Sequence, residues 1–297
     1  MTEILDEETR KLVARVTGAP DFITPWLDRF YDAGDAELVR LASGEPPDLG
    51  EIPAPRLDRA VRRAILDRRD DGSFAPFSFH DRLEIWAMLE GWKDVPAPVH
   101  ERLADWEVAH YTESVREDPE TDYTYLLLDE AEAVIAAEPH VYLWPCDCRA
   151  IVSRCGKPSA VCLRFNNDRG LGWEISRERA VEVLRETDAA GLMHTDYIGR
   201  SAGDPHAICN CCTDCCFPHL AAARLGIEHE WPRRRHLAVV DDDACALCGT
   251  CAGRCPFEAI AMADEASTPV VDASSCRGCG LCSTGCSAEA IAMRPLA

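Results

Sequence analysis

The chain has 297 residues, of which 47% are hydrophobic and 28% are charged, a balance typical of globular proteins with a buried core. Its formal net charge of −21 argues against binding to nucleic acid or to anionic membranes. No apolar run reaches the roughly 18 residues of a membrane-spanning helix, and the acidic start of the sequence lacks the pattern of a secretory signal. We therefore expect a cytoplasmic protein without membrane insertion.

The first region, residues 1–140, contains no cysteine and is strongly acidic. Amphipathic patterns separated by Pro-rich segments predict helices over residues 8–16, 55–69, 79–89 and 126–137. Residues 1–144 carry a net charge of −17, which either serves solubility or attracts a basic protein partner. We expect a helical N-terminal domain here.

The second region, residues 141–236, is expected to form a small α+β domain. Ser176 is placed to cap a helix that ends near Ala190, with Gly191 directly after it. The region holds nine cysteines: Cys146, Cys148, Cys155, Cys162, Cys209, Cys211, Cys212, Cys215 and Cys216. So many thiols without a ligand would be prone to oxidation, and clustered cysteines in a reducing compartment are more often metal ligands than disulfides.

The third region, residues 237–297, is an internal duplication with an offset of 31 residues. Glu258–Met262 returns unchanged as Glu289–Met293, and four cysteines recur with the same offset. The first half reads Cys245-x2-Cys248-x2-Cys251-x3-Cys255-Pro256, and the second reads Cys276-x2-Cys279-x2-Cys282-x3-Cys286.

This spacing lets three thiolates reach three irons of one cube, while the fourth cysteine ligates the other cluster. Such spacing assigns Cys245, Cys248, Cys251 and Cys286 to cluster I. It assigns Cys276, Cys279, Cys282 and Cys255 to cluster II. Zinc is the alternative, but eight cysteines in a duplicated pattern of this kind rarely bind it.

Residues 237–297 resemble the bacterial ferredoxins that hold two [4Fe–4S] clusters, and the resemblance implies a duplicated ββα-type domain. Ser287 departs from the family pattern, which often has proline at this position, whereas Pro256 keeps it in the first half. Since Ser287 ligates nothing, the departure concerns the local turn alone.

The central cysteines leave several alternatives open. Cys209, Cys212 and Cys215 repeat the ferredoxin triad spacing, with a fourth ligand from Cys146, Cys148, Cys155 or Cys162, while Cys211 and Cys216 fall outside that register. The nine thiols suit one or two further iron–sulfur clusters, a larger cluster, a zinc site or a redox-active dithiol. Arg149 directly follows a candidate ligand and would compensate cluster charge.

A wider resemblance covers residues 120–297. Cys146-Asp147-Cys148-Arg149 and the run Cys209-Asn210-Cys211-Cys212 are similar to a group of bacterial 4Fe–4S dicluster-binding proteins with a helical N-terminal part. Relatives have a denser cysteine run where this chain has Thr213-Asp214. The resemblance implies electron transfer.

Motifs for other chemistry are absent from the sequence. Gly170-Leu171-Gly172 lacks the third glycine of a dinucleotide fingerprint, and no Walker loop, nucleophile elbow or HExxH motif is present, so we expect no flavin or NAD site. We expect an electron-transfer protein with redox protein partners. The alternatives are a reductase with a catalytic central cluster and a redox-responsive regulator.

Overall fold

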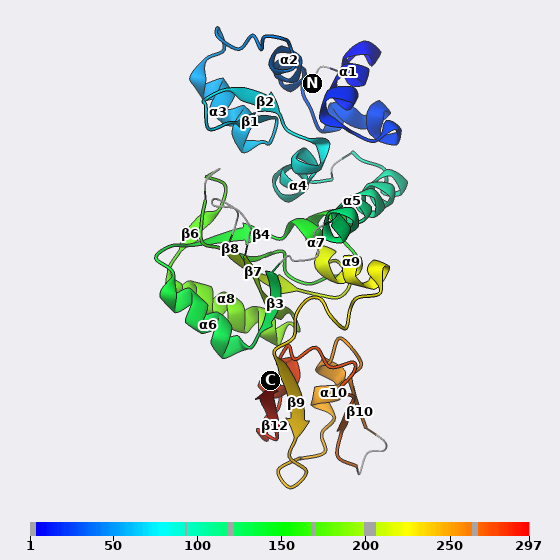
Figure 1. Cartoon of the computed structure of the whole chain (residues 1–297), viewed down its shortest axis with the longest axis vertical. Coiled ribbons are helices and arrows are strands. Elements are labelled where there is room, and N and C mark those ends of the chain that lie inside the picture. Colours follow the sequence, from blue (N-terminus) through cyan, green and yellow to red (C-terminus); the bar gives the residue numbers. More distant parts are fainter. Residues whose placement is uncertain are drawn as a thin grey trace. The chain divides into compact units, whose positions relative to one another are not determined.

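A computed structural model describes residues 4–92, 94–117, 122–167, 170–198, 206–262 and 267–296 (Figure 1). The chain forms two compact units. The first consists of Met1–Glu107, Ala150–Val152 and Asp168–Leu171. The second consists of Val108–Arg149, Ser153–Asn167 and Gly172–Ala297, and it contains every cysteine.

The first unit is built mainly of short helices around an aromatic core. The Phe30 ring packs edge-on against the Phe79 ring, with 5.2 Å between the centroids. It also packs at a tilt against the Trp86 ring, with 4.3 Å between the centroids. The elements are α1 (Glu7–Thr17), a 3-10 helix (Asp21–Arg29), α2 (Ala33–Ala42), α3 (Ala54–Arg62), β1 (Leu66–Arg68), β2 (Phe74–Pro76), α4 (Phe79–Leu89) and the start of α5 (Ala97–Glu117).

One predicted helix in this unit is partly wrong. The helix expected over residues 55–69 ends at Arg62, and the following residues form β1, which pairs with β2 in an antiparallel hairpin. Gly72 adopts φ +81 in the connecting turn, a conformation that suits glycine. Pairing with a partner strand therefore overrides the helical pattern here.

The second unit contains a six-stranded antiparallel sheet in the order β3-β7-β8-β5-β4-β6. Its strands are β3 (Asp122–Leu126), β4 (Val141–Pro145), β5 (Ala160–Arg164), β6 (Trp173–Ile175), β7 (Met193–Ile198) and β8 (His206–Cys211). Its helices are α6 (Leu128–Ala137), α7 (Asp147–Val152), α8 (Arg177–Ala189) and α9 (Phe217–Leu225). Strand β3 and helix α6 belong to this sheet unit although they precede the expected boundary at residue 140, because β3 pairs with the distant β7.

Two buried cores lie against this sheet. Helices α6 and α8 bury Ile135, Ala180 and Leu184 in one core together with Ile208 of β8. Ser176 caps α8 by accepting a hydrogen bond from the Arg179 N–H, and Gly191 follows with φ +72, as the sequence predicts. The other core contains Tyr123, Tyr125, Met193, Cys211, Cys216, Ala221, Ala222, Trp231 and Leu281.

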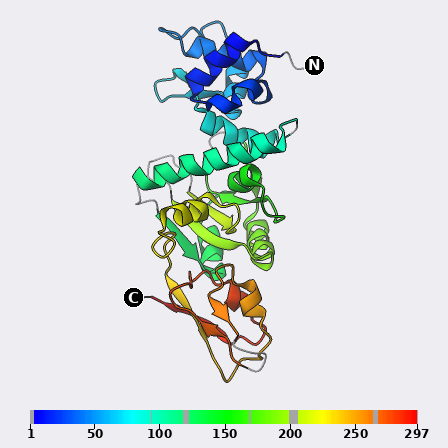
Figure 2. The ribbon, with the colours of Figure 1, turned by 90° about the vertical axis from the view of Figure 1, so that its right-hand side faces the viewer.

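The C-terminal module interleaves its two halves (Figure 2). Strand β9 (His236–Val240) of the first half pairs with β12 (Ile291–Pro295) of the second, and β10 (Ile260–Ala261) pairs with β11 (Val270–Val271). Each half has the order strand, helix, strand, with α10 (Thr250–Arg254) and α11 (Leu281–Thr284) in the middle. The ββα order expected from the sequence is therefore wrong. A helical turn starts directly after Gly249 and Gly280, and so precedes the second strand of each half.

Helix α8 holds the module through one carboxylate. Asp188 accepts hydrogen bonds from the Arg254 guanidinium at 2.9 Å and from the Thr284 hydroxyl at 2.9 Å. Arg254 also donates to the carbonyl of Leu281 at 2.8 Å. These contacts join α8, α10 and α11 into one network.

The overall class is confirmed as α+β. Within the described part of the chain, no helix combines the length and the apolar character needed to cross a membrane.

Substitution of Asp188 tests this network. We expect Asp188→Asn to lower the free energy of unfolding of the second unit by about 1–3 kcal/mol, because hydrogen bonds to a charged group contribute on that order. Amide hydrogen exchange in α11 should become faster. Asp129→Asn, on the exposed start of α6, is the control. Equal exchange in the two variants would contradict this role of Asp188.

Candidate metal centres

The first candidate centre, cavity I, lies in the C-terminal module. Its lining includes Cys245, Cys248, Cys251 and Cys286, the four residues that the sequence assigns to cluster I. Cys248 is exposed, and so are Asp241, Asp242 and Asp243 just before the first ligand. This cavity therefore lies close to solvent beside an acidic segment.

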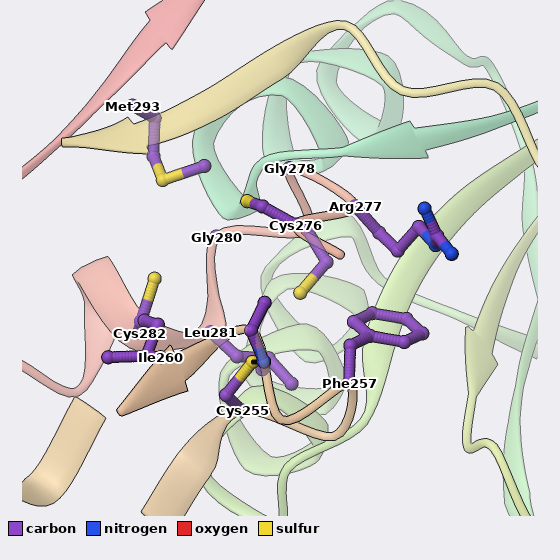
Figure 3. Close-up of a pocket in the computed structure, with 12 residues that line it drawn as sticks. Cys255, Phe257, Ile260, Cys276, Arg277, Gly278, Gly280, Leu281, Cys282 and Met293 are labelled. Carbon is purple, nitrogen blue, oxygen red and sulfur yellow. Dashed lines mark hydrogen bonds between the residues drawn. The ribbon is translucent and has the colours of Figure 1, made fainter. Parts of the chain in front are cut away.

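The second candidate centre, cavity II, lies in the same module (Figure 3). Its lining includes Cys255, Cys276, Cys279 and Cys282, the predicted ligands of cluster II. Cys276 and Cys282 are buried, and burial raises the pKa of the Cys282 thiol to about 12. Phe257 and Arg277 also line this cavity. Two of the four cysteines of cavity II are therefore buried, whereas in cavity I only Cys251 is.

Backbone N–H groups point at cysteine sulfurs in both halves of the module. The Ala259 N–H lies 3.3 Å from Cys255 Sγ, and the Ala290 N–H lies 3.3 Å from Cys286 Sγ, so the contact repeats with the duplication. The Leu247 N–H donates to Cys245 Sγ at 3.4 Å. Such donors stabilise thiolates and help to set the reduction potential of a bound cluster.

Left-handed backbone shapes the ligand loops. Leu247 and Gly278 occupy equivalent positions with φ +56 and φ +68. The loop at Gly278 is covered by the incoming chain, since a Cβ there would lie 2.2 Å from the His236 carbonyl oxygen. The second half therefore requires glycine where the first half accommodates leucine.

Both cavities fit an iron–sulfur cluster. Each is lined by four thiols, and the tight backbone at Gly278 closes cavity II as only glycine allows. Among the described residues, none of the eight module cysteines belongs to a group of three ligand atoms that lie within 4.8 Å of one another. Their sulfur atoms are therefore spread around the two cavities and do not contact one another in threes.

The central cysteines, in contrast, lie in close contact. Cys146 and Cys148 lie with their neighbour Asp147 in one local group, and two further groups bring together cysteines from different segments. The first contains Cys155, Cys212 and Cys215, whose sulfurs lie within 4.8 Å of one another. The distance between Cys155 Sγ and Cys212 Sγ is 3.7 Å. A hydrogen bond from Cys215, with Arg149 donating as well, lowers the pKa of Cys212 to about 5.

The second central group contains Cys211 and Cys216 together with His219, again within 4.8 Å. Cys211 Sγ and Cys216 Sγ are 3.3 Å apart. Cys209 contacts Cys211, and Cys148 contacts Cys216. Cys162 in turn contacts Cys209, and Cys146 contacts Cys148.

This grouping differs from the triad that the sequence spacing favours. Among the described residues, the sulfurs of Cys212 and Cys215 lie within 4.8 Å of Cys155 Sγ, and Cys209 is not part of that group. Cys209 and Cys211 lie at alternate positions of β8, so both side chains point to the same face of the sheet. Cys212 follows the strand and turns toward Cys155. Because Cys209 lies within β8 and Cys212 follows the strand, their side chains do not converge as they would in a ferredoxin loop.

Arg149 lies between the two central groups. Its backbone N–H is 3.4 Å from Cys146 Sγ, and its guanidinium is 3.8 Å from Cys212 Sγ. The side chain is 4% exposed, and its remaining bonds go to the carbonyls of Pro158 and Asn210. Burial opposes the charge, but the neighbouring thiols raise the pKa of Arg149 above its ordinary value. It is placed to balance thiolate charge.

The structure places three residues beside the cysteines that the sequence analysis did not single out: His219, Tyr125 and Phe257. His219 lies three residues after Cys216 at the start of α9. Its ring nitrogen Nε2 is 2.8 Å from the Tyr125 hydroxyl. Phe257 lines cavity II. The Cys216-x2-His219 spacing was the available signal for His219, whereas the other two depend on tertiary contacts.

Two glycines with the same backbone conformation provide a matched test of cavity II. We expect Gly278→Ala to lose about four of the roughly eight irons of the module, because its Cβ would meet the His236 backbone. Gly249→Ala has the same φ of +68, but its Cβ would meet only the movable Met262 sulfur at 3.0 Å. It should retain the iron. Equal iron contents after anaerobic purification would contradict this difference.

Serine variants test the central grouping. We expect Cys155→Ser and Cys212→Ser to lose the same metal, because their sulfurs lie 3.7 Å apart in one group. Cys162→Ser should retain that metal, since Cys162 contacts Cys209 instead. Metal content by elemental analysis is the measurement. Retention in Cys155→Ser with loss in Cys162→Ser would show that the grouping is wrong.

A family model described as "4Fe-4S dicluster domain" matches residues 237–287. No curated protein matches the chain. The family match covers the C-terminal module and leaves the central cysteines unassigned. It supports the ferredoxin-like resemblance and the binding of iron–sulfur clusters by residues 237–287.

Proposed function

We propose that the chain is an iron–sulfur electron-transfer protein or subunit. In this proposal, the C-terminal module exchanges single electrons with a redox protein partner, and the central cysteines hold the metal centre at the other end of the relay. [4Fe–4S] clusters bound in the module supply one-electron chemistry at low potential. The protein positions the two ends, insulates the path between them and presents a docking surface.

The proposal rests on an aromatic bridge between cavity II and the central cysteines. Phe257, which lines cavity II, lies 6.1 Å from Tyr125 and 6.2 Å from His219 between ring centroids. His219 lies within 4.8 Å of the Cys211 and Cys216 sulfurs. Packed side chains thus connect the two sites.

Burial supports the same connection. Cys279 of cavity II and Cys209 of the central group both pack against the core that contains Tyr125 and Cys211. Burial first, and then the nearby Cys279 and Cys211 sulfurs, raise the pKa of Tyr125 well above its ordinary value. The phenol therefore stays protonated and neutral on the path between the two sites.

The exposed end of the module fits a basic partner. Cys248 and the preceding residues Asp241–Asp243 are exposed at cavity I. The net charge of −21 would attract a positively charged redox protein and would speed its association at low ionic strength. The order of sites in the proposal is accordingly partner, cavity I, cavity II and central centre.

A reductase is the second candidate function. Cys155, Cys212 and Cys215 provide three donors beside the Arg149 guanidinium. Three protein ligands with an open position are typical of catalytic metal sites, and a guanidinium binds anionic groups well. A substrate reduced only when the first central group is intact would favour this function.

Replacing Phe257 tests the relay. We expect Phe257→Leu to slow reduction of the central centre several-fold or more, because the aromatic contact with Tyr125 and His219 is lost. Reduction of the module itself should be unchanged. Rapid-freeze electron paramagnetic resonance (EPR) after mixing with dithionite measures both processes.

Phe165→Leu is the control, since Phe165 packs in the core on the opposite face of the sheet. Equal rates in the two variants would contradict the bridge. More than about eight irons per chain is also required, because the module alone accounts for eight.

A further inference from the structure

The geometry points to a mixed thiolate–imidazole site, in which Cys211, Cys216 and His219 bind one transition-metal ion. This inference deepens the proposed function, because it names the metal site at the receiving end of the relay. Its evidence, however, is the local arrangement of these three side chains and their neighbours.

The three donor atoms converge on one point. They lie within 4.8 Å of one another, and the two sulfurs are 3.3 Å apart. Metal–sulfur bonds of about 2.3 Å and metal–nitrogen bonds of about 2.0 Å place the donors of a tetrahedral ion about 3.5–3.8 Å apart. Among the described residues, none of the module cysteines belongs to such a close group of donor atoms. The central group therefore suits a single ion better than a cube.

His219 is oriented as a ligand would be. Nε2 is 2.8 Å from the Tyr125 hydroxyl, and Nδ1 is buried without a hydrogen-bond partner in the described structure. Metal-binding histidines almost always donate their second ring N–H to an outer acceptor. With Nε2–H donated to Tyr125, the lone pair of Nδ1 is free to bind a metal. Tyr125 is then a positioning residue.

Hydroxyl groups surround the Cys211 sulfur. The Thr195 hydroxyl is 3.4 Å from Cys211 Sγ, and the Tyr123 hydroxyl is 3.5 Å from it. Both can donate to a metal-bound thiolate and share its charge. Cys148, which contacts Cys216, and Cys209, which contacts Cys211, are the candidates for a fourth donor. The site is thus supplied with both ligands and supporting hydrogen bonds.

The sequence explains how the site is assembled. Cys211 ends strand β8, whereas Cys216 caps helix α9 and His219 lies within its first turn. The side chains of Cys216 and His219 are three positions apart, which places them on one face of the helix. Tetrahedral thiolate–imidazole ligation selects zinc or iron among the common metals.

Metal analysis of full-length protein purified without oxygen tests the site. We expect His219→Gln to lose one metal ion per chain, while the roughly eight irons of the module remain. His219→Cys should restore the ion, because a thiolate replaces the imidazole. His194→Gln is the control, since His194 is also buried, on β7, but bonds to Asn210. It should keep the ion.

Two further readouts separate ligation from a purely structural role. Tyr125→Phe should keep the fold and bind the ion about 10–100-fold more weakly, measured by competition with a chelator. In the wild-type protein, X-ray absorption at the zinc edge, or nitrogen coupling in pulsed EPR for iron, should show one bound imidazole. The wild-type measurement decides the question even if His219→Gln does not fold.

Each outcome decides between the two proposals. A folded His219→Gln chain with unchanged metal, or sulfur-only ligation in the wild type, would overturn this site. Zinc with one imidazole would support the site and contradict the electron relay. Iron with one imidazole would support both.

Discussion

The position of the iron–sulfur module depends on a short backbone pairing with strand β3. The Arg233 N–H donates to the Tyr123 carbonyl at 2.7 Å, and the Tyr125 N–H donates to the Arg233 carbonyl at 3.0 Å. Residues 231–235 are thereby fixed along the edge of the sheet. Since His236 begins β9 immediately afterwards, this pairing determines where the module starts.

Fixing the start of the module brings two kinds of site into one core. The His236 backbone passes over Gly278 of cavity II, and Trp231 is buried beside Tyr123. Leu281 of the module then packs with Tyr125 and Cys211. A duplicated cluster-binding domain thus becomes continuous with a thiol-rich sheet, and that continuity is the physical basis of the electron relay that we propose.

The sequence predicted the metal sites whose ligands follow a short repeated spacing. It failed where contacts between distant segments determine which cysteines lie together. The repeat offset assigned Cys245 and Cys276 to different centres, and each lines the cavity expected from that assignment. Within the central region, Cys155 meets Cys212 from 57 residues away, and strand alternation directs Cys211 and Cys212 to different groups. Neither effect is visible in the spacing of the cysteines. Similarly, the β1–β2 hairpin replaced a predicted helix because strand pairing is non-local.

The most direct test is the EPR spectrum of the fully reduced protein. We expect magnetic interaction between cluster II and an iron-containing central centre to split or broaden the spectrum. This interaction should disappear when Cys211 and Cys216 are both replaced by serine, while the module keeps its own signals. Identical spectra from the wild-type and variant proteins, both with full iron content in the module, would contradict a relay between the two sites.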